Sequence, residues 1–304
     1  MPRLIPQSVY RLAAKHSPLL PYFIPACHNL AAAKQELHWV KQELPETQWL
    51  DAARLRKQHY PLQYILGTQP FGELDIRCKP GVLIPRWETE EWVLQLARVL
   101  SPIVESKQNY GILDLCTGTG CIPLLLQHEL GSTIKQSKPQ NVRTIGVDIS
   151  PLAVELARKN SQTTVLPTQF VQGDVFEPQT VMASMHEMDF RPDFITANPP
   201  YIPRKQFEAS RFEKSVKQHE PELALVGDSE FYRTLVEKWI NPMRVQGFVF
   251  ELGEVHQCEY TRDLLGNDWD CGILYDSNSQ VRCVVGWVKG GEYETLRGLC
   301  QKVY

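Results

Sequence analysis

Residues 114–120 read Asp114-Leu115-Cys116-Thr117-Gly118-Thr119-Gly120. The apolar run Gly111–Leu115 predicts a buried strand that ends in this stretch, and Cys121–Leu130 after it predicts a helix. Glycines at such a turn let the backbone approach a ligand, and the helix N-terminus offers free N–H groups. The turn lacks the Gly-Lys-Ser/Thr ending of a phosphate-binding loop and the Gly-x-Gly-x-x-Gly dinucleotide pattern. A ligand-binding turn and a purely structural tight turn both stay open.

Strands and helices alternate through the rest of the chain. Four more short apolar strands are predicted at Arg143–Asp148, Gln169–Val171, Asp193–Ala197 and Gly247–Leu252. Helices are predicted at Pro151–Asn160, with Ser150 as its N-cap and Pro151 as its first residue, and at Phe231–Ile240. Two late strands, Trp269–Tyr275 and Gln280–Val288, predict a hairpin that ends the sheet. This order predicts an α/β fold, a doubly wound sheet with helices on both faces.

The residues before the sheet differ in character. Residues 29–60 are rich in Ala, Leu, Gln, Glu and Lys, which predicts helices. Residues 62–85 predict a hairpin of short strands with glycine turns, at Tyr64–Gly67, Phe71-Gly72 and Leu74–Cys78. A helix is then expected from the N-cap Thr89, with the apolar face Trp92, Val93, Leu96, Ala97 and Leu100.

Two acidic side chains follow the next two strands. Asp148 ends a strand, where a carboxylate can accept hydrogen bonds from both hydroxyls of a ribose. The alternative, a helix cap, is already supplied by Ser150. Gly173-Asp174-Val175-Phe176 joins a short acid to an aromatic ring, which suits the amino group and face of an adenine, although alone it would indicate a turn. Because the carboxyl ends of parallel strands share one edge, these residues and the 114–120 loop predict one pocket.

The fourth strand ends in Asn198-Pro199-Pro200-Tyr201. An amide nitrogen is a poor nucleophile, because its lone pair is delocalised, and a site that alkylates it can hold both N–H hydrogens with acceptors. The Asn198 side-chain oxygen and the Pro199 carbonyl are two adjacent acceptors. The prolines stiffen the turn, and Tyr201 offers a flat wall for a planar amide or base. The alternative is a proline-stiffened loop without chemistry.

The composition excludes several classes of protein. With 304 residues, 43% hydrophobic and 22% charged, the chain is an ordinary globular protein large enough for more than one domain. A net charge of −3 argues against holding long duplex nucleic acid by its phosphates. The sequence contains no apolar run of about 18 residues, so no membrane helix is indicated. The eight cysteines form no CxxC pair and no zinc-ligand spacing, so we expect reduced thiols, an intracellular location and no metal site.

The start of the chain is free of acidic residues as far as Glu36. Before it stand the cations Arg3, Arg11, Lys15 and Lys34. Such a start is typical of an organelle transit peptide, often mitochondrial. The alternative is a short basic helical start, although prolines at positions 2, 6, 18, 21 and 25 argue against an amphipathic helix.

Taken together, the 114–120 loop, Asp148, Asp174 and Asn-Pro-Pro-Tyr resemble a class I S-adenosylmethionine-dependent methyltransferase. Its Asn-Pro-Pro-Tyr form is shared by enzymes acting on planar nitrogens. Three upstream stretches resemble the HemK/PrmC family in particular, and most of all its mitochondrial fungal branch. These stretches are Pro61-Leu62-Gln63-Tyr64-Ile65-Leu66-Gly67, Phe71-Gly72 and Gly81-Val82-Leu83-Ile84-Pro85-Arg86-Trp87-Glu88-Thr89-Glu90.

This resemblance implies a Rossmann-like sheet ending in an antiparallel hairpin, with a small N-terminal helical domain. It also implies methylation of the side-chain amide nitrogen, N5, of the glutamine in the Gly-Gly-Gln motif of a class I peptide chain release factor. S-adenosylmethionine would be the cofactor and S-adenosylhomocysteine its product. We expect a substrate-recognition domain at 1–60, a hairpin linker at 61–88 and a catalytic domain at 89–304. A monomer in the mitochondrial matrix is expected, with the cytoplasm as the alternative.

The resemblance also assigns roles to residues. Catalysis would fall to Asn198, Pro199 and Tyr201, and substrate binding to Asn198, Pro199, Pro200 and Tyr201. Cofactor binding would fall to Asp114, Thr117, Gly118, Thr119, Gly120, Asp148, Asp174, Val175, Asn198 and Arg86. In this assignment Asp148 holds the ribose, Asp174 and Val175 hold the adenine, and the Thr117–Gly120 backbone follows the methionine part.

The sequence departs from the family pattern at four places. Cys116 replaces the first glycine of the loop, and Trp87 stands where proline is usual. Val226-Gly227-Asp228 lacks the common double glycine, and Ser279-Gln280-Val281-Arg282 replaces Gly-Ile-Pro-Arg. These departures bear on the shape of the substrate cleft rather than on the chemistry.

Two other functions share part of this evidence. A nucleic-acid methyltransferase acting on adenine N6 or guanine N2 would use the same acceptors. Basic residues between 204 and 219 would then meet RNA: Arg204, Lys205, Arg211, Lys214, Lys217 and His219. A solvated helix face that also includes Glu208 and Glu213 is the better explanation of them. A non-catalytic adaptor is the third candidate, and the intact Asn198–Tyr201 and Asp148 speak against it.

Overall fold

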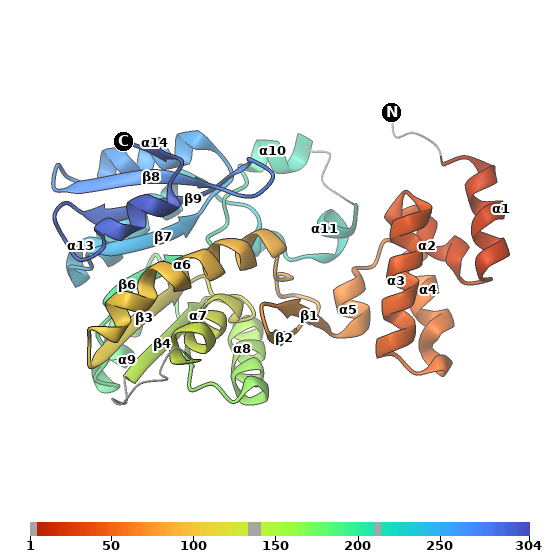
Figure 1. Ribbon diagram of the computed structural model, residues 1–304, viewed down its shortest axis with the longest axis horizontal. Coiled ribbons are helices and arrows are strands. Elements are labelled where there is room, and N and C mark those ends of the chain that lie inside the picture. Colours follow the sequence, from red (N-terminus) through yellow and green to blue (C-terminus); the bar gives the residue numbers. More distant parts are fainter. Residues whose placement is uncertain (1–4, 133–140, 210–213) are drawn as a thin grey trace.

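The structure, a computed structural model, describes residues 5–132, 141–209 and 214–304. Figure 1 shows a group of N-terminal helices set to one side of a larger sheet domain, with a small hairpin between them. No helix in these ranges is long and apolar enough to cross a membrane.

The N-terminal helices bury an apolar core of their own. They are α1 (Gln7–His16), α2 (Leu20–Cys27), α3 (Leu30–Glu43), η1 (Glu46–Gln48) and α4 (Trp49–Lys57). Their buried residues are Ala13, Leu20, Phe23, Ile24, Ala33, Leu37, Val40, Ala52, Ala53 and Leu62. A buried ion pair crosses the group, since the Arg56 guanidinium donates to both oxygens of Glu36, at 2.7 and 2.8 Å.

Two expectations for the first 28 residues are corrected. Helical structure begins at Gln7 rather than near residue 29. Pro6 is the N-cap of α1 and Pro21 lies in the first turn of α2, where a missing N–H costs nothing, whereas Pro25 lies inside α2. Pro2 and Arg3 lie outside the described residues.

The linker contains one helix that the sequence pattern did not indicate. Tyr64 and its neighbours lie in α5 (Leu62–Leu66), not in a strand. Gly67 ends that helix with a φ of 88°, and its N–H donates to the carbonyl of Gln63 at 2.8 Å. The predicted hairpin then follows as β1 (Thr68–Phe71) and β2 (Leu74–Arg77), which pair antiparallel.

Helix α6 (Trp87–Glu105) starts two residues before the predicted cap. Arg86 is its N-cap, and Trp87 is its first residue, a position that suits the proline usual in the family. Thr89 is not a cap, because its hydroxyl donates to the buried Glu251 carboxylate at 2.7 Å. The predicted apolar face is confirmed as buried.

The predicted doubly wound sheet is confirmed. Its eight strands run in the order β10-β8-β9-β7-β6-β3-β4-β5. Five are parallel: β3 (Asn109–Leu115), β4 (Asn141–Asp148), β5 (Gln169–Gln172), β6 (Phe194–Ala197) and β7 (Gly247–Glu251). The predicted hairpin is present as β8 (Trp269–Tyr275) and β9 (Val281–Val288). It does not end the sheet, because the short β10 (Lys302–Val303) pairs with β8 outside it.

Helices cover both faces of the sheet (Figure 1). Helices α6 and α7 (Cys121–Ser132) share one apolar cluster with the sheet, to which α8 (Pro151–Thr164) contributes. The other cluster joins α9 (Gln179–Glu187), α12 (Ser229–Thr234), the π-helical η3 (Leu235–Ile240) and α14 (Val255–Leu264). The Ser150 cap and Pro151 start of α8 are confirmed. Helices α9 and α14 were not predicted.

The remaining short elements are α10 (Arg204–Ala209), α11 (Lys214–His219), η2 (Glu222–Ala224), α13 (Asn241–Met243) and η4 (Glu294–Leu299). All eight cysteines are free thiols. The register aligns Leu115 with both Val147 and Ala197. The 114–120 loop therefore leaves the sheet between Asp148 and Asn198.

Candidate active site

A cleft opens at the carboxyl ends of β3, β4 and β6, beyond which the chain leaves the sheet. Its walls include six of the predicted site residues: Gly118, Asp148, Asp174, Val175, Asn198 and Pro200. The others lie outside its lining: Asp114, Thr117, Thr119, Gly120, Arg86, Pro199 and Tyr201. A larger hollow at the opposite ends of the strands, around Tyr110 and Arg143, contains none of these residues.

The carboxylate of Asp148 links two backbone segments at the cleft. One oxygen accepts the N–H of Gly118 at 2.8 Å, and the other accepts that of Ser150 at 2.9 Å. Burial raises the pKa of Asp148, and these two N–H groups oppose the rise. Each oxygen keeps a lone pair, so the carboxylate can still accept two hydroxyl groups of a ribose.

The loop after β3 follows the backbone path that glycine favours. Cys116, Gly118 and Gly120 have φ values of 59, 55 and 79°. Cys116 therefore occupies the family's glycine position in a left-handed conformation, and its side chain lines the cleft. Burial raises the pKa of its thiol well above the ordinary value, so the group is not a thiolate nucleophile at neutral pH.

Three predicted cofactor residues of this stretch have buried side chains. Thr117 and Thr119 are buried, and the N–H of Thr117 donates to the Val147 carbonyl at 2.9 Å. Asp114 is fully buried and accepts the Thr196 hydroxyl at 2.7 Å. Burial raises the pKa of Asp114 to about 7.

The cleft has an aromatic side near Asp174. One oxygen of Asp174 accepts the Phe176 N–H at 2.8 Å, which fixes the turn and leaves the other oxygen for a ligand. The Val175 carbonyl accepts the Trp239 indole N–H at 2.9 Å, so Val175 is fixed as well. Phe176 packs edge-on against Phe231, and both rings line the cleft. Phe231 was missed, because it lies in a helix that the sequence places far from the cleft.

Two loops from distant parts of the chain form the roof of the cleft: residues 81–83 and 221–224. Glu220 joins them, because its buried carboxylate accepts the Ile84 N–H at 3.3 Å and the Arg86 guanidinium at 2.6 Å. Arg86 thus acts on the roof through Glu220. Glu220 was not predicted as a site residue, because its partners lie more than 130 residues away in the sequence.

The Asn198–Tyr201 turn presents its carboxamide to the cleft. Among the residues that the structure describes, Asn198 has no hydrogen-bond partner for its side chain, whereas Pro199 and Pro200 are buried. After the turn, Ile202 pairs with Val226 in a parallel bridge. A Cβ on Gly227 would lie 2.5 Å from the Pro200 carbonyl oxygen. Gly227 alone therefore lets the 226–228 backbone pack closely against the Asn198–Tyr201 turn, although the family's usual double glycine is absent.

The site can therefore hold an adenosine at strand ends and a planar nitrogen beside it. No group of three His, Cys, Asp or Glu within the described ranges is placed to hold a metal ion. The Asn198 carboxamide, which lines the cleft, offers an oxygen that can accept a hydrogen bond from such a nitrogen. This arrangement suits direct group transfer between two bound molecules.

Comparison with known proteins agrees with this chemistry. A family model described as a methyltransferase domain matches residues 106–216. The mitochondrial MRF1 N(5)-glutamine methyltransferase MTQ1 of Saccharomyces cerevisiae is 38% identical over 297 residues, which cover 94% of this chain and 89% of that protein. The chain belongs to the release factor glutamine methyltransferase family.

Other relatives in this family are similar over most of their length. The probable MRF1 mitochondrial N(5)-glutamine methyltransferase of Schizosaccharomyces pombe is 34% identical, over 94% of this chain and 96% of its own. The release factor glutamine methyltransferase of Geobacter sulfurreducens is 35% identical, over 81% and 78%. The protein is thus an S-adenosylmethionine-dependent methyltransferase with a class I fold, and the adaptor alternative is set aside.

Proposed function

We propose that the protein transfers a methyl group from S-adenosylmethionine to the side-chain nitrogen, N5, of the glutamine in the Gly-Gly-Gln motif of a class I release factor. The observation that carries this proposal is the unpartnered Asn198 carboxamide, which faces the same cleft as Asp148 and Asp174. The names of the relatives support the substrate, since three of them are glutamine methyltransferases for MRF1 or a release factor.

In this proposal the cofactor lies across the strand ends. Asp148 holds the ribose hydroxyls, and the free oxygen of Asp174 with the Val175 backbone N–H holds the adenine. The backbone of Thr117–Gly120 follows the methionine part, and the roof fixed by Glu220 and Arg86 covers the cleft. The side chains of Thr117, Thr119 and Asp114 are buried beneath this stretch and act on the cofactor only through its backbone.

The target glutamine enters beside Asn198. Its two N–H hydrogens donate to the Asn198 side-chain oxygen and the Pro199 carbonyl, and the Tyr201 ring lies against its plane. The nitrogen lone pair forms the new N–C bond as the methyl–sulfur bond breaks and S-adenosylhomocysteine leaves. The surplus proton becomes acidic only after transfer and passes to water. Positioning and exclusion of water supply most of the acceleration, and no strong base is needed beforehand.

The nucleic-acid alternative receives no support from the basic segment. Arg204 is paired with Glu222, and Lys217 donates to the Glu208 carbonyl at 3.0 Å, as a solvated face would have them. Arg211 lies outside the described residues.

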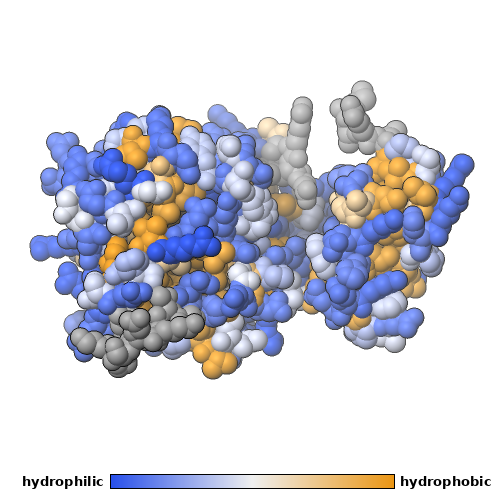
Figure 2. Space-filling view, viewed as in Figure 1, coloured by the Kyte–Doolittle hydropathy of each residue, from blue (hydrophilic) through white to orange (hydrophobic). Residues whose placement is uncertain are grey.

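The N-terminal helices are proposed to recognise the release factor. Figure 2 shows hydrophobic residues at the surface of this part of the molecule as well as on the sheet domain. Leu12, Leu50 and Leu55, all in these helices, are more than a third exposed. The location proposed is the mitochondrial matrix, because two relatives are named mitochondrial and the first 35 residues carry no acid. The protein is proposed to act as a monomer.

The test offers purified protein four acceptors with tritiated S-adenosylmethionine: release factor, tRNA, rRNA and DNA. Label in the release factor, and in its glutamine after digestion, is the expected result. Label in RNA or DNA with none in the release factor would overturn the proposal.

A further inference from the structure

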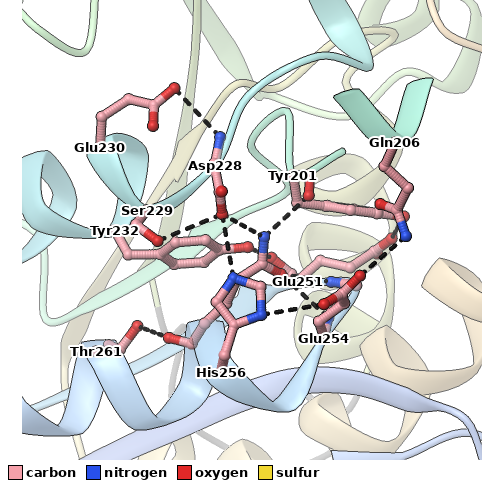
Figure 3. Close-up of polar contacts among 12 residues, drawn as sticks. Tyr201, Gln206, Asp228, Ser229, Glu230, Tyr232, Glu251, Glu254, His256 and Thr261 are labelled. Atoms are coloured by element: carbon pink, nitrogen blue, oxygen red, sulfur yellow. Dashed lines mark hydrogen bonds and ion pairs between the residues drawn. The ribbon is translucent and has the colours of Figure 1, made fainter. Parts of the chain in front are cut away.

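Tyr201 is held by one short segment at the end of β7. Its hydroxyl donates to a Glu251 carboxylate oxygen at 3.2 Å, and its carbonyl accepts the side-chain N–H of Gln257 at 2.9 Å. A Cβ on Gly253 would lie 3.0 Å from Cδ2 of the Tyr201 ring. Figure 3 shows Tyr201 beside Glu251 and Tyr232, with the turn into α14 around them. The phenol, the ring and the backbone of Tyr201 therefore all meet residues 251–257.

Glu251 is itself fixed from another side of the fold. It is almost completely buried, and its second oxygen accepts the Thr89 hydroxyl at 2.7 Å and the Trp92 indole N–H at 2.9 Å. Both donors belong to the rigid helix α6. The oxygen that receives the Tyr201 hydroxyl thus cannot turn away without breaking two buried hydrogen bonds.

Gln257 is equally constrained. Its side chain is fully buried, and its oxygen accepts the N–H groups of Gly253 and Glu254 at 2.9 and 3.1 Å. Its nitrogen donates to the Tyr201 carbonyl and, at 3.2 Å, to Asp228. Every hydrogen-bonding group of this carboxamide is used, so its nitrogen has one orientation only.

We propose that Glu251 and Gln257 are positioning residues, which set the Tyr201 wall and through it the acceptors of Asn198 and Pro199. This proposal rests on the proposed function. The chemistry supports it, because direct transfer depends on alignment, and a displacement of about 1 Å can cost about a hundredfold in rate. Neither residue lines the cleft, so each acts indirectly, and Tyr201 is the residue of the turn that both of them contact.

Two matched pairs of variants test this role. Tyr201→Phe and Tyr232→Phe each delete one buried phenol that donates to Glu251, the first to its carboxylate and the second to its backbone carbonyl at 3.0 Å. Gln257→Glu and Gln127→Glu each replace a buried amide that donates to a backbone carbonyl, of Tyr201 and of Val142 respectively. Only the first member of each pair touches the Asn198–Tyr201 turn.

The expected result is a kcat for methyl transfer that falls about ten- to a hundredfold in Tyr201→Phe and Gln257→Glu, with the cofactor Kd within about twofold of wild type. Tyr232→Phe and Gln127→Glu should lower the melting temperature and leave kcat near wild type. Unchanged kcat in Tyr201→Phe and Gln257→Glu would overturn the proposal, and so would equal losses in the control variants.

A second readout needs no substrate. Amide hydrogen exchange of Asn198, Tyr201 and Ile202 should quicken in Tyr201→Phe and Gln257→Glu and stay at the wild-type rate in the two controls. Unaltered exchange in the first two variants would overturn the proposal even if the release factor proved to be the wrong substrate. A wild-type enzyme that fails to methylate the release factor would instead contradict the proposed function.

Discussion

The carboxylate of Asp148 accepts the backbone N–H of Gly118 at 2.8 Å, so the end of β4 fixes the loop that leaves β3. Asp148 is the last residue of β4, and Gly118 lies in the loop that follows the neighbouring parallel strand β3 at the cleft. Asp148 therefore has two tasks, which are to shape the loop and to bind the ribose. Removing it should affect both the loop and the cofactor.

Asp148→Ala should weaken binding of S-adenosylmethionine by roughly 2–4 kcal/mol, because two charge-assisted hydrogen bonds to the ribose are lost. Isothermal titration calorimetry measures the change. Asp193→Ala is the matched control, since Asp193 accepts the Gly111 N–H at 2.8 Å at the other end of β3. Unchanged affinity in a folded Asp148→Ala protein would contradict the ribose assignment.

Asp114 should make stability depend on pH. Its pKa is about 7 in the folded protein, because of burial, and about 4 when unfolded. Between these values the folded state binds more protons than the unfolded state, so its contribution to stability is complete below about pH 4 and is lost as pH rises to about 7.

Asp114→Asn removes this dependence, so its stability relative to wild type should rise across that window by at most about 4 kcal/mol. Urea unfolding at a series of pH values measures the difference. A difference that stays constant from pH 4 to pH 8 would show that Asp114 is ionised throughout.

Glu220→Gln should loosen the roof of the cleft. The side chain keeps an acceptor for the Ile84 N–H but loses the ion pair with the Arg86 guanidinium. We expect faster release and about tenfold weaker binding of S-adenosylhomocysteine, because breaking a largely buried pair costs more than breaking an exposed one. Glu222→Gln, which breaks the exposed pair with Arg204 nearby, is the control and should change affinity little.

Residues 1–17 should direct import into mitochondria. Their positive charge and lack of acids favour this, although α1 also packs against the other N-terminal helices through Ala13. A fusion of residues 1–40 to a fluorescent reporter is expected in mitochondria. A fusion that stays in the cytosol would favour the cytoplasmic alternative and leave the catalytic argument intact.

The strands could be predicted because each is a short apolar run, and the cleft could be predicted because parallel strands end at one edge. The predicted strand at Tyr64–Gly67 was wrong, since the helix there, Leu62–Leu66, has only five residues, too few to separate the periodicity of a helix from that of a strand. Threonine is a residue type that often caps helices, but the Thr89 hydroxyl instead donates to Glu251, which lies 162 residues away in the sequence.

The supports of the site depend on such distant contacts as well. Glu220 meets Arg86 across 134 residues, and Gln257 meets Tyr201 across 56. No local pattern encodes these pairings, because only the folded chain brings the partners together. The residues that face the ligand are marked by their place at strand ends, whereas those that hold them in place are not.

Asn198 should act on the glutamine rather than on the cofactor. Asn198→Ala is expected to bind S-adenosylmethionine nearly as wild type does, while its barrier to transfer rises by roughly 3–4 kcal/mol, a few hundredfold in rate. Asn198→Asp keeps one acceptor oxygen and adds a negative charge near the sulfonium. It should retain some activity and bind the cofactor more tightly.

The most direct test of the account measures tritiated methyl transfer to a release-factor fragment that carries the Gly-Gly-Gln loop. The same fragment with the glutamine replaced is the matched acceptor, and wild type and Asn198→Ala are compared on both. We expect label only on the glutamine fragment, with a loss of a few hundredfold in Asn198→Ala. Label on the replaced fragment, or full activity in Asn198→Ala, would mean that the nucleophile and its acceptor have been misidentified.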